Sequence, residues 1–173
     1  MSLIYLISSL PMLSFDARPS ITSSKFVEAC REQLSAAEAT AAEALLSGGS
    51  SAHPFVAAWR DKDAILRNAV AEQRARLAGK EASRWLHPVQ GCDSRIESLV
   101  EDAFQENDPL KREKELDKAR WLIVEELQGF DPLDINVIFA YAVKLAILFR
   151  WFSLNADQGR QTFETLTKVP LTL

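Results

Sequence analysis

The most apolar stretch of the chain runs from residue 133 to 154, LDINVIFAYAVKLAILFRWFSL, and Lys144 and Arg150 interrupt it. A helix that is apolar on all sides is buried either in protein or in lipid. A lysine in the middle of a membrane span costs about 2.5–3.5 kcal/mol. The pattern therefore predicts no transmembrane span but the central, least exposed helix of a helical bundle, in which both cations need partners.

Caps and breaks elsewhere predict further helices. Ser35 followed by Glu38 matches a capping box, and Gly79 has the position of a helix-ending glycine. Asn155 can cap the last helix. The predicted helices cover residues 22–34, 35–46, 54–78, 93–105, 109–128, 133–154 and 156–167, with a short helical piece at 81–86.

The N-terminal part is less decisive. Residues 3–10 fit either a strand or a first helical turn, and Pro11 and Pro19 favour an extended connector over residues 11–21. We expect an all-α fold: an irregular multi-helix bundle with long central antiparallel helices and a short extended N-terminal segment. Residues 1–173 should form a single helical domain. A short similarity in sequence between residues 62–67 and 144–150 leaves open a division of this domain into two helical sub-units, 1–90 and 91–173.

Composition and charge limit the classes of binding partner and the cellular compartment that the sequence favours. The chain has 173 residues, 47% of them hydrophobic, and a net charge of −4, so no basic excess favours nucleic acid. Cys30 and Cys92 are the two cysteines, too few for a disulfide framework and consistent with free thiols in a reducing cytosol. The apolar N-terminus has no basic leading segment, so we interpret it as part of the fold.

The sequence contains no recognisable catalytic, cofactor or metal motif. The histidines and cysteines are too widely spaced for a usual structural zinc site, and the Gly48-Gly49 pair is not followed by the Lys-Ser or Lys-Thr of a phosphate-binding loop. The chain should therefore need no cofactor.

Two polar clusters are candidates for structural or interaction roles. Arg67-Asn68 and Arg74 lie on the helix predicted at 54–78, and Asn68, a weak helix former, is expected to be held by a buried hydrogen bond. The second cluster contains Asp117, Arg120 and Trp121. Its Asp117, or a neighbouring glutamate, should pair with Lys144 or Arg150. The alternatives are a surface salt bridge, and cations whose long stems reach water.

These residues carry a resemblance that covers most of the chain. The sequence resembles a small bacterial family of unknown function whose genes lie among those of V/A-type ATPases. The matching positions are residues 5–13, 30–35, 66–68, 116–121 and 140–145, with Trp59, Arg74, Arg150-Trp151, Gly159 and Phe163-Glu164. More distantly, the chain is similar to the C-type subunit of V/A-type ATPases, called d in the eukaryotic enzyme, at about half its expected size.

The resemblance implies a non-catalytic accessory or stalk component of a bacterial V/A-type ATPase. Its partners would be other subunits, at the stalk or rotor ring, and it would be cytoplasmic, peripheral to the inner face of the membrane through the complex. The alternatives are an assembly factor or helical adaptor for the same complex, and a small helical enzyme that uses Arg67, Arg74 and the acidic helix around Asp117.

Such a component needs an exposed apolar or aromatic surface. Trp121 and Trp151 lie in apolar runs and are expected in the core, whereas Trp85 has few core neighbours in sequence and is the better anchor. The second candidate surface is the apolar connector that contains Leu10, Met12 and Leu13.

Overall fold

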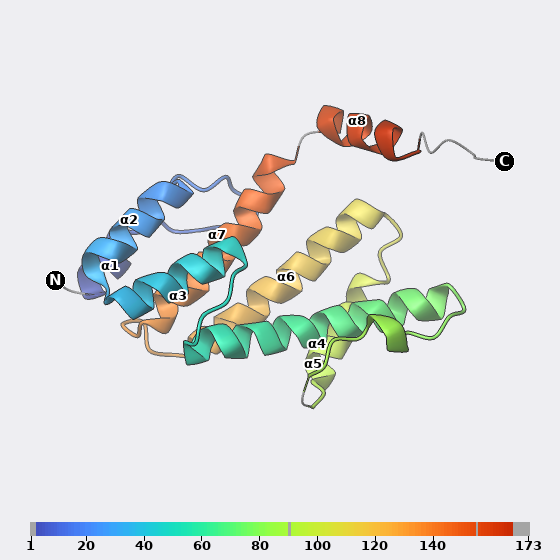
Figure 1. Ribbon diagram of the computed structural model, residues 1–173, viewed down its shortest axis with the longest axis horizontal. Coiled ribbons are helices and arrows are strands. Elements are labelled where there is room, and N and C mark those ends of the chain that lie inside the picture. Colours follow the sequence, from blue (N-terminus) through green and yellow to red (C-terminus); the bar gives the residue numbers. More distant parts are fainter. Residues whose placement is uncertain (1–2, 90, 155, 168–173) are drawn as a thin grey trace.

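The computed structural model describes residues 3–89, 91–154 and 156–167, and the regular elements in these ranges are all helical (Figure 1). In chain order they are α1 (Leu3–Ser9), α2 (Ser23–Gln33), α3 (Ala36–Ser47), α4 (Pro54–Leu77), the 3-10 turn η1 (Ser83–Trp85), α5 (Ser94–Ala103), α6 (Pro109–Gln128), α7 (Asn136–Ser153) and α8 (Ala156–Thr167). The predicted all-α fold class is confirmed.

Local chemistry accounts for the helix ends. The Ser35 hydroxyl accepts a hydrogen bond from the Glu38 backbone N–H, and the Glu38 carboxylate accepts one from the Ser35 N–H, which is the predicted capping box. Gly79 follows α4 with a φ of 63°, a left-handed conformation that glycine adopts without strain. The predicted cap Asn155 lies outside the described residues.

The N-terminal alternatives are resolved in favour of a helix. Residues 3–9 form α1, and its Leu6 is completely buried, which explains why this short piece is ordered against α2. The connector begins after α1, turns at residues 14–17 and continues to Thr22, the N-cap of α2.

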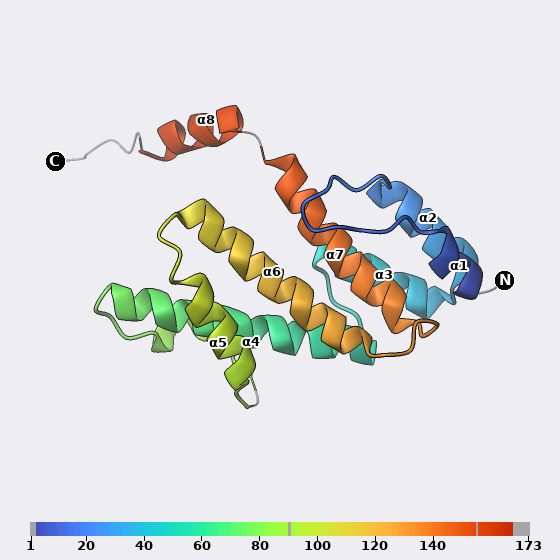
Figure 2. The same ribbon diagram turned by 180° about the vertical axis from the view of Figure 1, so that it is seen from behind.

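The helices are arranged around α7 (Figures 1 and 2). Helix α3 packs on one side of α7, and α6 packs on the other side, antiparallel to α7. Beyond α6 lie α4 and α5, and α1 and α2 cover α3 at the opposite end. Helix α8 extends from the end of α7 and stands apart from the packed helices in both views.

Two hydrophobic clusters form the interior. The first core is built from α1, α2, α3, the start of α4, the end of α6 and α7, and it includes Phe26, Phe55 and Phe139. The second core joins α4, α5 and α6 through residues such as Leu66 and Val100. Helices α4 and α6 each contribute residues to both cores. A contact that fixes α4 against α6 therefore also fixes the two cores against each other.

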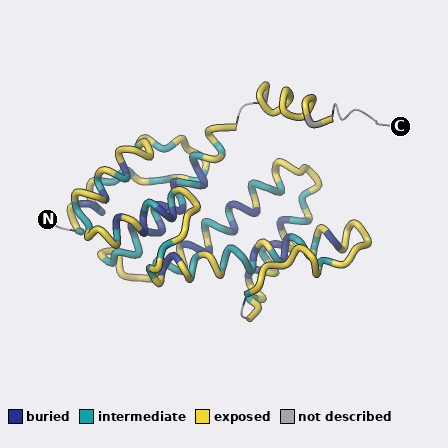
Figure 3. The backbone as a smooth tube through the Cα atoms, in the orientation of Figure 1, coloured by how far each residue is buried: buried dark blue, intermediate teal, exposed yellow. Residues whose placement is uncertain are grey.

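Helix α7 is the least exposed of the described helices, as predicted (Figure 3). Eight of its residues are buried, and exposure is confined to its last turn. Its length and composition would also allow it to cross a membrane, a test that buried core helices pass as well, and 44% of it is buried within this fold.

The apolar spacing of residues 54–78 predicts Leu77 on the core side of α4, and this prediction is wrong. Leu77 is exposed, because the last turn of α4 runs past the helices that cover its middle.

The two cysteines are both free, and the structure predicts opposite reactivities for them. Cys30 lies in the first core, where burial raises the pKa of its thiol to about 12, whereas Cys92 is exposed. Because the thiolate is the reactive form, a thiol-specific reagent at pH about 8 should modify Cys92 alone in the native chain. Denaturation should release the second thiol. Native labelling of a Cys92→Ser variant would contradict the burial of Cys30.

Candidate functional site

A charged network lies where α4, α6 and α7 meet, and Asp117 is its centre. This carboxylate is 1% exposed, the one charged residue buried in the described part of the chain. Its Oδ1 accepts a hydrogen bond from Arg120 Nη1 at 3.0 Å, and its Oδ2 accepts one from the Trp151 indole at 2.7 Å. Arg150 pairs with the same Oδ2. Asp117 on α6 therefore binds groups on both α6 and α7.

The network continues into α4 through Arg120. Arg120 Nε donates to Asp63 Oδ1 at 2.9 Å, and Asp63 Oδ2 pairs with Arg67 at 2.7 Å. Burial acts to lower the pKa of Arg120, but the two aspartates outweigh it and leave the pKa raised. Arg120 therefore stays charged, as a buried carboxylate such as Asp117 requires.

The predicted pairing of the central helix is confirmed for both cations. Arg150 binds Asp117, and Lys144 Nζ lies 2.9 Å from Glu125 Oε1 and 5.1 Å from the centre of the Trp121 ring. The Trp121 indole donates to the same Glu125 oxygen at 2.9 Å. Asp117 itself is buried, so its pairs are not surface salt bridges, although the Arg150 side chain is 51% exposed.

The two tryptophans expected in the core are only half-buried. Trp121 and Trp151 each donate their indole N–H to a carboxylate, Glu125 and Asp117 respectively. An indole needs such a partner when it is removed from water, so the polar network holds both rings at the edge of the core.

Asn68 fixes the segment that follows η1. Its amide nitrogen donates to the His87 carbonyl at 2.9 Å, and its amide oxygen accepts from the His87 N–H at 2.7 Å. The predicted hydrogen bonding is present, but it was wrongly expected to be buried: Asn68 is half-buried, because its partner is surface backbone and not another core helix. This pairing holds residues 86–89 against α4.

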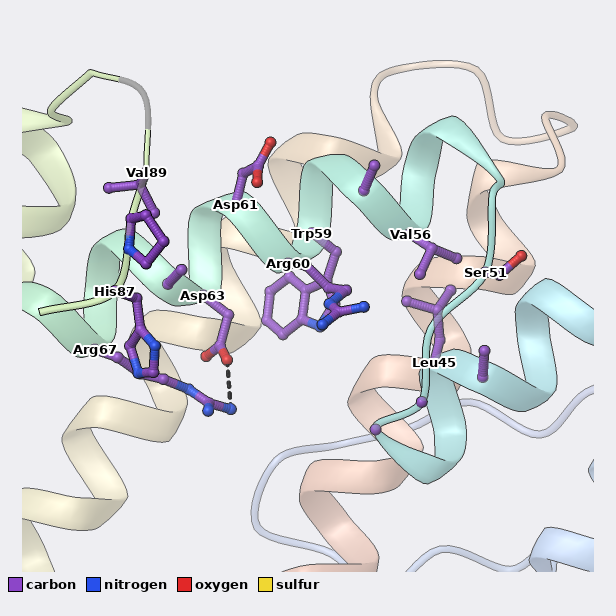
Figure 4. Close-up of a pocket in the computed structure, with 16 residues that line it drawn as sticks. Leu45, Ser51, Val56, Trp59, Arg60, Asp61, Asp63, Arg67, His87 and Val89 are labelled. Carbon is purple, nitrogen blue, oxygen red and sulfur yellow. Dashed lines mark ion pairs between the residues drawn. The ribbon is translucent and has the colours of Figure 1, made fainter.

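Two cavities border this region. One, of about 570 Å³, follows α4 from the Gly48 loop to residues 87–89, and Figure 4 shows Asp63 and Arg67 joined by their ion pair along it. The other, of about 530 Å³, lies between α4, η1 and α6, and we call it the α4–α6 groove. Asp117 lines neither cavity, so neither one brings it together with Arg67 in the arrangement that a helical enzyme would use.

The α4–α6 groove collects four of the candidate residues that are distant in sequence. Arg67, Arg74, Trp85 and Arg120 all line it. Arg74 crosses from α4 to pair with Glu113 of α6 at 2.9 Å. Trp85 is 47% exposed, as predicted for an anchor.

The apolar connector forms a second candidate surface. Leu10, Met12 and Leu13 line a small cavity together with Lys144. Met12 is 95% exposed, whereas Leu10 and Leu13 are half-buried against the first core. The exposure expected for at least one of the two surfaces is therefore found at both.

Sequence reasoning missed the loop between α6 and α7. Phe130 is fully exposed and Leu133 is half exposed. A phenylalanine beside Asp131-Pro132 in a predicted helix break was the available signal. Figures 1 and 2 show this loop at the same end of the molecule as α1, whose Tyr5 is also exposed. We call the exposed residues Tyr5, Met12, Phe130 and Leu133 the end patch.

Among the described residues, no group of three or more His, Cys, Asp or Glu side chains could hold a metal ion. His53 caps α4 by accepting from the Phe55 N–H, and His87 is engaged through its backbone by Asn68.

Comparison with known proteins identifies the family. Residues 49–169 match the family described as Protein of unknown function (DUF2764), and the chain belongs to this family. No curated protein and no solved structure matches the chain. The matched region begins just before α4 and includes the charged network, the α4–α6 groove and the α6–α7 loop.

The burial of Asp117 predicts a large stability cost for its removal. Asp117→Ala would leave the Trp151 N–H and one side of Arg120 without a partner, and we expect a loss of about 3 kcal/mol in the free energy of unfolding. Glu115→Ala on the same helix removes an exposed pair with Lys118 and should cost under about 1 kcal/mol. Urea denaturation measures both, and equal costs would contradict the network's role.

Removal of the Lys144 ammonium should lower the free energy of unfolding by less than removal of Asp117. Its partner Glu125 is 46% exposed, so the carboxylate left by Lys144→Met can be solvated by water. We expect a loss of about 1 kcal/mol or less, measured by the same denaturation. A loss of several kcal/mol would mean that Glu125 is held away from solvent.

Proposed function

We propose that the chain is a non-catalytic accessory or stalk component, similar to the C-type subunit, of a bacterial V/A-type ATPase. Its work is to hold partner surfaces together, in the cytoplasm and at the inner face of the membrane through the complex. The assignment to this machine rests on the sequence resemblance. The observation that carries the interaction role is the end patch.

The end patch supports a binding role because its residues are large, apolar and unusually accessible. Phe130 is fully exposed on a short loop, and Met12 stands almost free of the fold. Large apolar residues that are exposed near one another mark sites of interaction. The connector that carries Met12 lines one cavity with Gln128 and Val137, which flank the loop of Phe130. Aromatic residues and methionine are also the residue types enriched in protein interfaces.

The first core gives this patch a firm base. Leu10 and Leu13 on either side of Met12 pack against it, and the Tyr141 hydroxyl donates to the Pro11 carbonyl at 2.9 Å. Asp131 and Asp134 accept backbone hydrogen bonds within the loop that carries Phe130. The exposed side chains are therefore presented by anchored backbone, which reduces the entropy cost of binding.

Affinity isolation of the tagged full-length chain from its native cell tests the proposal. V/A-type ATPase subunits should co-purify, and the chain should migrate with the intact complex; migration with assembly intermediates alone would favour an assembly factor. Phe130→Asp should lower this recovery about tenfold. Leu110→Asp, which alters an exposed leucine at the other end of α6, should not. Absence of ATPase subunits from the eluate would contradict the proposal.

A further inference from the structure

The floor of the α4–α6 groove is apolar. Val70, Ala75 and Leu116 are buried at its base. Ala71 and Ala75 of α4 and its C-cap residue Ala78 follow one another at helical spacing and line the groove. Residues separated by three and four positions share one face of a helix. These small side chains leave room for the side chains of another helix to pack against this face. We call the three alanines the alanine track.

The rim of the groove is cationic. Arg67, Arg74, Lys80 and Arg120 line it, against a single lining acid, Glu113. Arg120 pairs with Asp63 and Asp117, Arg67 shares Asp63, and Arg74 pairs with Glu113. Arg67 and Arg74 are exposed in spite of these pairs, whereas Arg120 is largely buried, so Arg67, Arg74 and Lys80 are the cations that face solvent.

Arg67, Arg74 and Lys80 can bind further carboxylates. Arg67 and Arg74 are each about 60% exposed, and the described ion pair of each uses Nη2. A guanidinium has five N–H donors, so both retain donors that face solvent. Lys80 is exposed, and no acidic side chain in the described ranges forms an ion pair with it.

We propose that the α4–α6 groove binds an acidic amphipathic helix of a partner protein. The apolar stripe of that helix would lie on the alanine track, and its carboxylates would reach Arg67, Arg74 and Lys80. Trp85, half exposed and lining the groove, supplies the aromatic anchor typical of such sites.

The size of the groove limits the partner segment. Arg67 and Arg74 are seven positions apart on α4, which corresponds to roughly 10 Å at the rise of an α-helix, and Lys80 lies beyond the end of α4 at Leu77. A partner helix of about two to three turns spans the part of the groove that α4 lines. The inference rests on the proposed function only in that both make protein binding the work of the chain; the groove and the end patch are separate surfaces.

Site-specific photo-cross-linking identifies the occupant. The full chain carrying p-benzoyl-phenylalanine in place of Trp85 would be irradiated in its native cell, and the adduct sequenced by mass spectrometry. We expect a partner segment with apolar residues at helical spacing and more Asp and Glu than Lys and Arg. The same group at Leu110, exposed but outside the groove, should not capture that segment. No adduct, a basic segment, nucleic acid or a second copy of the chain would overturn the inference.

Binding of a synthetic peptide of the captured segment then tests the charge complementarity. Trp85→Ala and Arg74→Glu should each weaken the affinity about tenfold, and the wild-type affinity should fall as salt is raised. The matched control is Arg31→Glu, because Arg31 is a similarly exposed arginine paired with a glutamate on another face. Circular dichroism confirms that each variant is folded. Wild-type affinity in Arg74→Glu would refute the role of the cationic rim.

The outcomes separate this inference from the proposed function. An acidic amphipathic segment from a protein outside the ATPase would support the groove and contradict the proposed complex. A basic segment from an ATPase subunit would do the reverse.

Discussion

The carboxylate of Asp117 is the constraint on which the packing of the long helices depends. A buried charge is costly unless it is paired and hydrogen-bonded, so α6 can occupy its position only if α7 brings Arg150 and Trp151 to Asp117. Arg120 of α6 completes the site, and α4 brings Asp63 to Arg120. Apolar packing alone would tolerate sliding of one helix along another. The network specifies one register, and it does so between the two cores.

The rest of the architecture follows from this junction. Because α4 and α6 pass through both cores, the network makes one body from two small hydrophobic clusters. The two candidate surfaces lie on different parts of that body: the end patch beside the first core, and the α4–α6 groove over the second. Such an arrangement suits a component that holds two partner surfaces at a fixed separation.

Much of the fold could be predicted because its determinants are local. Capping residues, prolines and glycines set the helix ends, and two cations on an apolar helix required buried or bridging partners. Asp117 could be named because it lies in a mixed charged and apolar segment. Asp63 could not, since its role depends on how α4 crosses α6, and no local pattern distinguishes it from the neighbouring Asp61.

The surfaces were predictable only in part for the same reason. Trp85 stood out because it has few core neighbours in sequence, and Met12 because it lies in an extended apolar segment, but the groove arises where α4, η1 and α6 converge. Phe130 lies next to a helix break, and its exposure is decided by the path of the loop.

Hydrogen–deuterium exchange of the chain, free and within the complex isolated through it, tests most directly that this protein acts by presenting two binding surfaces on one rigid body. The account predicts added protection at residues 4–13 and 129–134 and along the groove at residues 67–86, with little change in α5. Protection spread evenly over the chain, or confined to α5 and α8, would contradict it.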